Sequence, residues 1–208
     1  MNEGILLVGA SGLAREVLAA GITGVVGMVD DDADLQGTTV GGIPVVGTVG
    51  DVAARSEALL VCVGRSQGRR SVVRRLRESG VGADRYATYV ARSARIGASS
   101  RIGPGSIVLD GVVVTADAVL GHHVVVMPNC TITHDDVLED FVTLAAGVSL
   151  GGSVRIGPAA YLGMSASVRQ GLTVGEAATV GMGAVVLDHV PAAATWAGVP
   201  AREIRRPA

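Results

Sequence analysis

The chain has 208 residues, enough for one large domain or two modest ones, and a formal net charge of −2 at pH 7. This balance gives no electrostatic reason to expect a nucleic acid or an anionic membrane as a partner. Because the sequence contains no lysine, a Schiff-base lysine, a P-loop lysine and a lysine general base are all excluded.

Cysteine use and hydropathy predict a cytoplasmic protein. Cys62 lies in an apolar run and Cys130 lies at a core position of a repeat, which is typical of reduced, buried thiols. The first residues lack the basic start of a signal peptide, and no apolar stretch is long enough to span a membrane.

The first ninety residues have the pattern of a small parallel α/β domain. An apolar run over 5–8 leads into a Gly-Ala-Ser-Gly turn and then a helical pattern over 13–20. Further apolar runs cover 25–29 and 58–63, and a helical pattern over 67–79 follows the last of them. Strands that end at turn residues and alternate with helices predict a parallel, Rossmann-like sheet.

Ligands of such sheets bind beyond the carboxyl ends of the strands, where the N–H groups of a helix N-terminus attract phosphate. Ser11, Gly12, Asp30, Asp31 and Gly64 all fall at that edge. The turn is shorter than a full G-x-G-x-x-G fingerprint, although Asp30 has the expected spacing from it. A tight turn that binds nothing therefore remains an alternative.

Six arginines occur close together on the second predicted helix and just before it. Val72, Val73 and Leu76 supply the buried stripe of that helix, so we expect most of the arginines to form a solvated face, with diphosphate binding as the alternative. They are Arg65, Arg69, Arg70, Arg74, Arg75 and Arg77.

From Val90 to Val186 every sixth residue is aliphatic without interruption. This period fits neither an α-helix nor a plain strand. It predicts short strands wound into a triangular coil, in which residues i and i+4 point inward and about 18 residues make one turn. A glycine often follows the aliphatic residue directly, and we expect these glycines to relieve corners with unusual φ angles.

One coil breaks the inward pattern. Asp136 occupies an i+4 position where the other coils have uncharged residues, and Thr133, His134 and Asp135 precede it. A carboxylate beside an imidazole raises its basicity and fixes its tautomer, so His134 is the candidate general base. The alternative is an exposed corner with a solvated histidine. We expect structural or solvated roles for His122, His123 and His189.

At this point the chain resembles the hexapeptide-repeat acyltransferases, and in particular the bacterial sugar O- and N-acetyltransferases. These include the sialic acid O-acetyltransferases and the UDP-4-amino-sugar N-acetyltransferases of bacillosamine synthesis. The resemblance runs along the whole length and is carried by Leu7–Gly12, Val29–Asp31, Val63–Gly64, Thr133–Asp135 and Ala197–Arg202.

The resemblance implies a left-handed parallel β-helix over residues 89–208, after a Rossmann-like nucleotide-sugar-binding domain over residues 1–88. It further implies a homotrimer with acetyl-CoA in the groove between neighbouring β-helices. The general base would be His134 and its acidic partner Asp135, which is Glu in many relatives. Zinc, as held by three histidines in the related γ-type carbonic anhydrases, is not expected, because their His-x₄-His pair is absent here.

The same correspondence implies the binding residues. The nucleotide-sugar would contact Ser11, Gly12, Leu13, Asp30, Asp31 and Gly64. The acetyl-CoA groove would be lined by Thr143, Gly152 and Met164. Two positions depart from the family pattern: Leu13 replaces a histidine found in many relatives, and Thr143 replaces a second histidine found in some.

These expectations favour direct acetyl transfer from acetyl-CoA to a nucleotide-linked 4-amino-4,6-dideoxy sugar, without an acyl-enzyme or a metal. A sugar O-acetyltransferase that acts on a sialic-acid-like hydroxyl is the first alternative. A non-catalytic trimeric scaffold or nucleotide-sensing module is the second.

Overall fold

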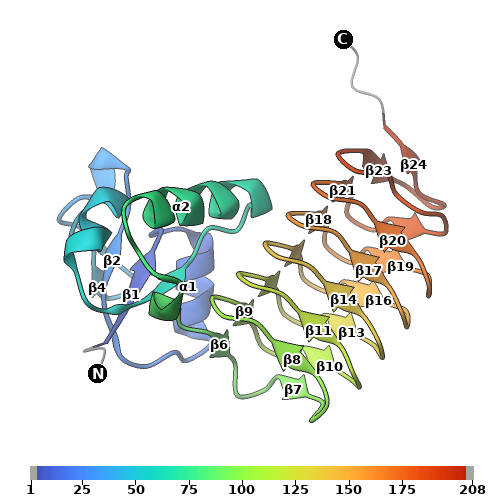
Figure 1. Cartoon of the computed structure of the whole chain (residues 1–208), viewed down its shortest axis with the longest axis horizontal. Helices are drawn as coiled ribbons and strands as arrows, with labels where there is room; N and C mark the ends of the chain where they lie inside the picture. The colour runs from blue at the N-terminus through green and yellow to red at the C-terminus, as the bar shows by residue number, and fades with distance from the viewer. Residues whose placement is uncertain (1–3, 205–208) are drawn as a thin grey trace.

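The computed structural model describes residues 4–204. The N-terminal part contains a parallel sheet in the order β2–β1–β5, formed by β1 Ile5–Val8, β2 Val25–Val29 and β5 Ala58–Val61. Helix α1, Gly12–Ala19, follows β1, and helix α2, Ser66–Glu78, follows β5 (Figure 1). The predicted strands and helices of this part are therefore confirmed.

The two helices cover opposite faces of this sheet. Leu7 of β1 packs in one cluster with Leu13 and Val17 of α1, whereas its neighbour Leu6 packs in another with Leu76 of α2. Alternate side chains of a strand point to opposite faces, which explains the division. The shorter elements are β3 Thr39–Val40, β4 Ile43–Pro44, and the 3₁₀ helices η1 Ala33–Leu35, η2 Val49–Ala54 and η3 Ala83–Arg85.

The second part is a parallel β-helix of two-residue strands that recur every six residues. They are β6 Tyr89–Val90, β7 Arg95–Ile96, β8 Arg101–Ile102, β9 Ile107–Val108, β10 Val113–Val114, β11 Val119–Leu120, β12 Val125–Val126, β13 Thr131–Ile132, β14 Val137–Leu138, β15 Thr143–Leu144, β16 Ser149–Leu150, β17 Arg155–Ile156, β18 Tyr161–Leu162, β19 Ser167–Val168, β20 Thr173–Val174, β21 Thr179–Val180 and β22 Val185–Val186.

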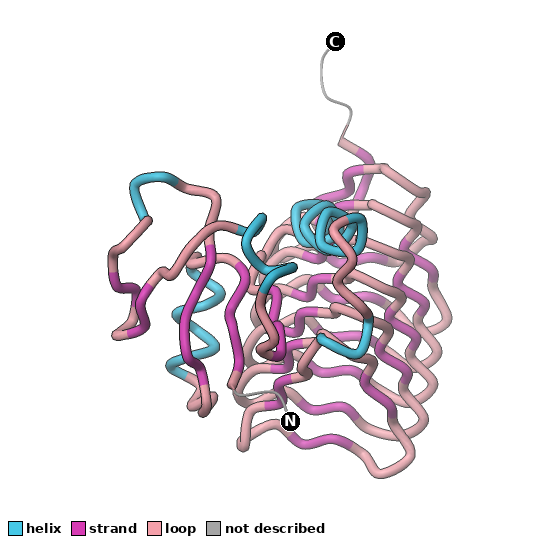
Figure 2. The backbone as a smooth tube through the Cα atoms, turned by 60° about the vertical axis from the view of Figure 1, so that its left-hand side comes forward, coloured by secondary structure: helices cyan, strands magenta, loops and turns pink. Residues whose placement is uncertain are grey.

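From β6 to β19 each strand pairs in parallel with the strand three elements later, so paired residues lie 18 apart, as Val113 and Thr131 do. The first sheet contains β6, β9, β12, β15, β18 and β21 and closes with β23 Thr195–Ala197 and β24 Arg202–Glu203. The second sheet runs from β7 to β22 and the third from β8 to β20. The stacked coils form a three-sided prism (Figures 1 and 2).

The inward pattern is confirmed. Val114, Leu120 and Ile132 are almost fully buried, and so are the residues four positions later, Ala118, Val124 and Asp136. Val90, in the first coil, is 37% exposed. Each fully buried aliphatic side chain contributes about 1.5–3 kcal/mol, so the column of stacked Val, Ile and Leu is the main source of stability in this part.

The prediction about the glycines is wrong. Positive φ angles occur three residues after the aliphatic position, at residues such as His123 and Asp135, and not at the glycines that directly follow it. The reason for those glycines is close contact between coils: a Cβ at Gly163 would lie 2.6 Å from the backbone N of Met182 in the next coil. Glycine therefore permits the coils to stack at strand spacing.

The α/β domain packs on the first sheet of the β-helix. Ile107 and Val125 of that sheet share an apolar cluster with Leu7 and Leu60 of the α/β domain, and Figure 2 shows the two parts side by side. A polar contact accompanies this cluster: the Ser66 hydroxyl donates to Thr143 Oγ1 at 3.0 Å.

Arg69 of α2 lies fully buried at this junction, with 0% of its surface exposed. Its guanidinium donates to His123 O at 2.8 Å, to Val63 O at 2.6 Å and to Thr143 Oγ1 at 2.9 Å. The expectation of a solvated arginine face is therefore wrong for Arg69. Arg70, Arg74 and Arg75 do carry exposed side chains, each paired with a carboxylate.

Within residues 4–204, no helix is both long enough and apolar enough to cross a membrane.

Candidate active site

The predicted base lies at the corner between the second and third sheets, in the loop that joins β13 to β14. His134 Nδ1 is 2.7 Å from Asp135 Oδ2, and both side chains are more than half exposed. Asp135 adopts φ = 61°, a left-handed conformation that aspartate tolerates better than most residues. When the carboxylate accepts a hydrogen bond from Nδ1–H, the lone pair of Nε2 is free to accept a proton.

Gly152 lies beside this imidazole, in the same corner one coil later. A Cβ at position 152 would lie 2.3 Å from His134 Nε2 and 2.4 Å from its Cε1. Only a residue without a side chain leaves room for the ring here. Gly152, predicted for the acetyl-CoA groove, therefore lies next to the predicted base.

Ser11 and Asp30, predicted to contact the nucleotide, lie at the carboxyl ends of β1 and β2 and bond to neighbouring backbone. The Ser11 hydroxyl donates to Cys62 O at 2.7 Å, and Asp30 Oδ2 accepts from Ala10 N at 2.7 Å. Because Ser11 occupies the N-cap of α1 but turns its hydroxyl to Cys62, no side chain caps the N–H groups of the first turn, which begins at Gly12. Such N–H groups attract anions.

Three other residues predicted at this edge point elsewhere. Asp31 accepts from Val49 N at 3.1 Å and pairs with Arg75 at 2.8 Å. The Gly64 carbonyl accepts from the Thr143 hydroxyl at 3.0 Å. The Leu13 side chain is buried in the apolar cluster under α1, so it fills the core and does not face a ligand.

The residues predicted for the acetyl-CoA groove lie in three separate places of one chain. Gly152 is at the His134 corner. Met164 is at the corner between the first and second sheets, where it is 54% exposed and lies one coil before the exposed Met182. Thr143 is buried under the α/β domain, contrary to expectation, because its hydroxyl takes part in the contact with Arg69 and Ser66.

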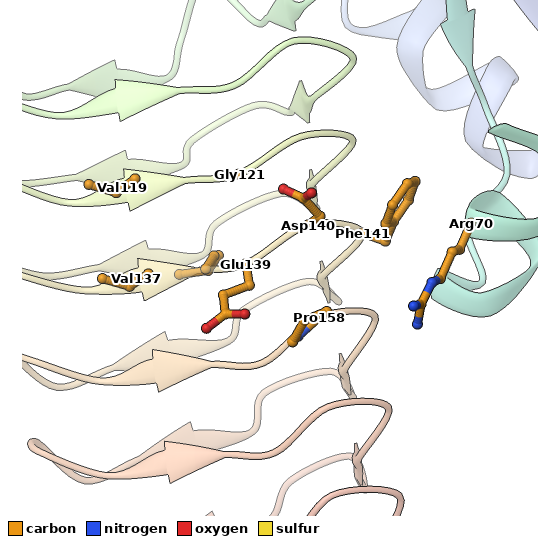
Figure 3. Close-up of a pocket in the computed structure, with 9 residues that line it drawn as sticks. Arg70, Val119, Gly121, Val137, Glu139, Asp140, Phe141 and Pro158 are labelled. Carbon is orange, nitrogen blue, oxygen red and sulfur yellow. The ribbon is translucent and has the colours of Figure 1, made fainter. Parts of the chain in front are cut away.

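Two adjoining cavities lie between α2 and the β-helix, away from the predicted base. One, of about 430 Å³, lies between Arg70 on one side and Asp140, Phe141 and Pro158 on the other (Figure 3). The other, of about 540 Å³, is lined by Gln67, Arg70, Ser71, Val73, Arg74, Arg77 and Phe141. No pattern in the sequence predicts this groove, because it depends on how α2 docks against the β-helix.

The remaining histidines have structural environments. His122 Nδ1 is 3.0 Å from Asp140 Oδ1, and Thr173 N donates to His189 Nδ1 at 3.0 Å. His123 is buried between Tyr86, edge-to-face at 4.5 Å, and Phe141, stacked at 5.2 Å. Among the described residues, no three of His, Cys, Asp or Glu are grouped as a metal ion would require.

His123 is expected to make stability depend on pH. Burial, assisted by the nearby Arg69 cation and by His122, lowers the pKa of His123 from 6.5 to about 4, against a smaller opposite effect of Asp140. Between pH 6.5 and 4, His123 is therefore protonated in the unfolded chain but neutral in the folded chain. The free energy of unfolding falls as the pH drops through this range. The loss attributable to this group is about 3 kcal/mol.

The variant His123→Asn, which suits the left-handed backbone at this position, tests this expectation by urea unfolding between pH 7.5 and 4. Asp136 titrates in both proteins and cancels in the comparison: burial raises its pKa to about 6, which stabilises the fold as the pH falls through 6. The stability gap between wild type and variant should shrink toward pH 4. A gap that stays constant would contradict the assignment.

Neither cysteine is placed for nucleophilic catalysis. Both Cys62 and Cys130 are fully buried, and burial raises the pKa of Cys62 to about 12 and that of Cys130 to about 11. Protonated, inaccessible thiols cannot attack a thioester. Two exposed imidazole–carboxylate pairs occur among the described residues, His134 with Asp135 at 2.7 Å and His122 with Asp140 at 3.0 Å.

No family model and no curated protein sequence matches the chain. Among solved structures, the acetyltransferase domain of PglB from Neisseria gonorrhoeae in complex with acetyl coenzyme A is 33% identical, with a TM-score of 0.88; the match covers 98% of this chain and 100% of that one.

PerB from Caulobacter crescentus, in complex with CoA and GDP-perosamine, is 30% identical over 97% of each chain, with a TM-score of 0.87. WeeI from Acinetobacter baumannii is 29% identical over 96% of this chain and 99% of its own, with a TM-score of 0.77. Identity at this level over whole chains, together with the six-residue coil and the exposed His134 corner, identifies the family. The chain belongs to the hexapeptide-repeat sugar acetyltransferases.

Proposed function

We propose that the protein is an acetyl-CoA-dependent N-acetyltransferase that acts on a nucleotide-linked 4-amino-4,6-dideoxy sugar, with His134 as general base. The observation that carries the proposal is the 2.7 Å contact between His134 Nδ1 and Asp135 at an exposed coil corner. The carboxylate holds the Nδ1–H tautomer, so Nε2 is the proton acceptor, as a general base requires.

In the proposed reaction the neutral sugar amine attacks the thioester carbonyl carbon of acetyl-CoA. Nε2 of His134 accepts the amine proton as the C–N bond forms, and the imidazolium then protonates the departing CoA sulfur as the C–S bond breaks. Asp135 stabilises the imidazolium between the two steps. Backbone N–H groups of a neighbouring coil stabilise the oxyanion. The burial of both cysteines supports direct transfer.

The substrate class rests on the relatives and on the α/β domain. PerB is seen with GDP-perosamine and CoA, which supports a nucleotide-linked amino sugar as acceptor and acetyl-CoA as donor here. We infer that residues 1–88 form the Rossmann-like nucleotide-sugar domain and residues 89–208 the left-handed β-helix domain. The uncapped N-terminus of α1 beside Ser11 and Asp30 supports a phosphate site at this edge.

We further infer a homotrimer with active sites between subunits. In one chain the α/β domain covers the first sheet, whereas His134 lies at the opposite corner, between the second and third sheets. Gly152 and Met164 likewise lie at different corners. A neighbouring subunit would supply the missing side of each site. The reduced, buried cysteines are in keeping with a cytoplasmic location.

The test is a thiol-release assay with acetyl-CoA against UDP-, GDP- and dTDP-linked 4-amino-4,6-dideoxy sugars, with His134→Ala alongside wild type. We expect release with one sugar and its loss in the variant. Release only with a hydroxyl acceptor such as a sialic acid would replace N-acetylation by O-acetylation. If the protein binds a nucleotide-sugar but acetylates no acceptor, the result would favour the alternative of a non-catalytic scaffold or nucleotide-sensing module.

A further inference from the structure

The coil ladder is interrupted at one place, directly before His134. Elsewhere the residue that follows a strand donates its N–H to a carbonyl of the next coil; Thr115 N donates to Ile132 O, Glu139 N to Ile156 O and Gly151 N to Val168 O, all at 2.9 Å. Between Ala91 and Gly181 of the described chain, every position of this kind has such a bond except Thr133.

At Thr133 two side chains replace the missing ladder bond. The Thr133 N–H donates to Asp136 Oδ2 at 2.7 Å, while the Thr133 hydroxyl donates to Leu150 O at 3.1 Å. The strand pairing reflects the change: β13 and β16 are joined only through Thr131 and Ser149, whereas the neighbouring pairs have both residues in register. The backbone N–H directly before His134 is thus not bonded to the next coil, and Thr133 reaches that coil through its side chain instead.

Asp136 is suited to this task because it is a carboxylate at an inward position. It is 0% exposed, and its second oxygen accepts from Val154 N in the next coil at 2.8 Å. Ser100 and Ser106 occupy the same position in other coils and accept only the equivalent of that second bond, from Ala118 N and Val124 N. In a regular coil a serine hydroxyl accepts one backbone N–H. The carboxylate of Asp136 accepts two, because its other oxygen binds the N–H of Thr133.

We propose that Thr133 and Asp136 are positioning residues for His134. They hold the two ends of the segment 133–136 in a geometry that the regular ladder does not give, and this geometry lays the imidazole over Gly152. This inference rests on the proposed role of His134 as base. It explains why a buried carboxylate, costly in an apolar core, occurs in this coil.

The test compares Asp136→Ser, which restores the residue type of Ser106, with Thr133→Val and Thr133→Ser. We expect Asp136→Ser and Thr133→Val to lower kcat by about 100-fold while the KM for acetyl-CoA changes little, because a misplaced base affects the chemical step. Thr133→Ser keeps the hydroxyl and should retain most of the activity. Ser106→Ala is the matched control in a coil remote from His134.

A second readout separates this proposal from the proposed function. The ¹⁵N shifts of the His134 ring report its tautomer and its contact with Asp135 whether or not an acceptor sugar has been found. The ¹⁵N shifts of the His134 ring should differ from those of wild type in Asp136→Ser and Thr133→Val. They should equal the wild-type values in Thr133→Ser and Ser106→Ala. Unchanged ring shifts in Asp136→Ser, or equal kcat values for Thr133→Val and Thr133→Ser, would overturn the positioning role even in an active enzyme.

Discussion

Replacement of Gly152 by alanine is expected to lower kcat by about 10²- to 10⁴-fold, the range that a general base contributes and that His134→Ala should also lose. A Cβ at position 152 would lie 2.3 Å from His134 Nε2, so the imidazole must swing away. The backbone at Gly152 is outside the left-handed region, and alanine is therefore compatible with it. The base would still be present but in the wrong place.

Steady-state kinetics and thermal unfolding together test this expectation. Because the displaced atoms are at the end of an exposed side chain, the melting temperature should change little while kcat falls. Gly50→Ala is the control. A Cβ at position 50 meets only Thr48 Oγ1 at 3.5 Å, and Gly50 lies in η2 of the α/β domain, not in the coil that carries His134. If the KM for acetyl-CoA rises instead and kcat persists, position 152 limits donor binding and does not set the position of the base.

Much of the fold follows from the sequence because its signals are periodic. A strict period of six determines the coil, the inward residues and the register, since every pairing among β6 to β22 joins residues 18 apart. The break at Asp136 is visible for the same reason. What the period does not contain is the docking of the α/β domain, which depends on contacts between distant segments. Thr143 fits the repeat like any other residue, and only that docking buries it.

The misreading of Arg69 shows where a local signal was available. Arg69 stands three, four and seven residues before Val72, Val73 and Leu76, so it belongs to the same helix face as the buried stripe. Charge alone favoured a solvated position. The structure shows the compensation that makes burial possible: a ring of backbone carbonyls at the β-helix corner. For His134, the imidazole and the adjacent carboxylate of Asp135 were enough to predict a base from the sequence. The missing ladder bond at Thr133 is a feature of backbone hydrogen bonding that no residue pattern shows.

The largest effect on stability is expected from Arg69→Met. The guanidinium satisfies neutral oxygens on both domains, among them Gly64 O at 3.2 Å, Phe141 O at 3.0 Å and Val142 O at 3.1 Å. Burial lowers its pKa to about 9, so it remains cationic at pH 7. Its removal takes the donor from His123 O, Val63 O and Phe141 O, which should cost about 3–5 kcal/mol in all, because each unsatisfied buried acceptor costs about 1–3 kcal/mol.

Calorimetry should resolve the consequence, because Arg69 joins two parts that each have their own apolar cluster. We expect the α/β domain of the variant to unfold before the β-helix, and we expect the wild-type protein to unfold in a single transition. Arg74→Met is the matched control on the same helix. The Arg74 side chain is exposed, and its one ion pair, with Glu78, is long at 3.9 Å, so its loss should cost less than about 1 kcal/mol. Arg69→Lys should recover part of the stability, since an ammonium supplies fewer donors than the planar guanidinium. A single transition at the wild-type temperature in Arg69→Met would show that the apolar contact through Ile107 and Val125 is sufficient to hold the domains together.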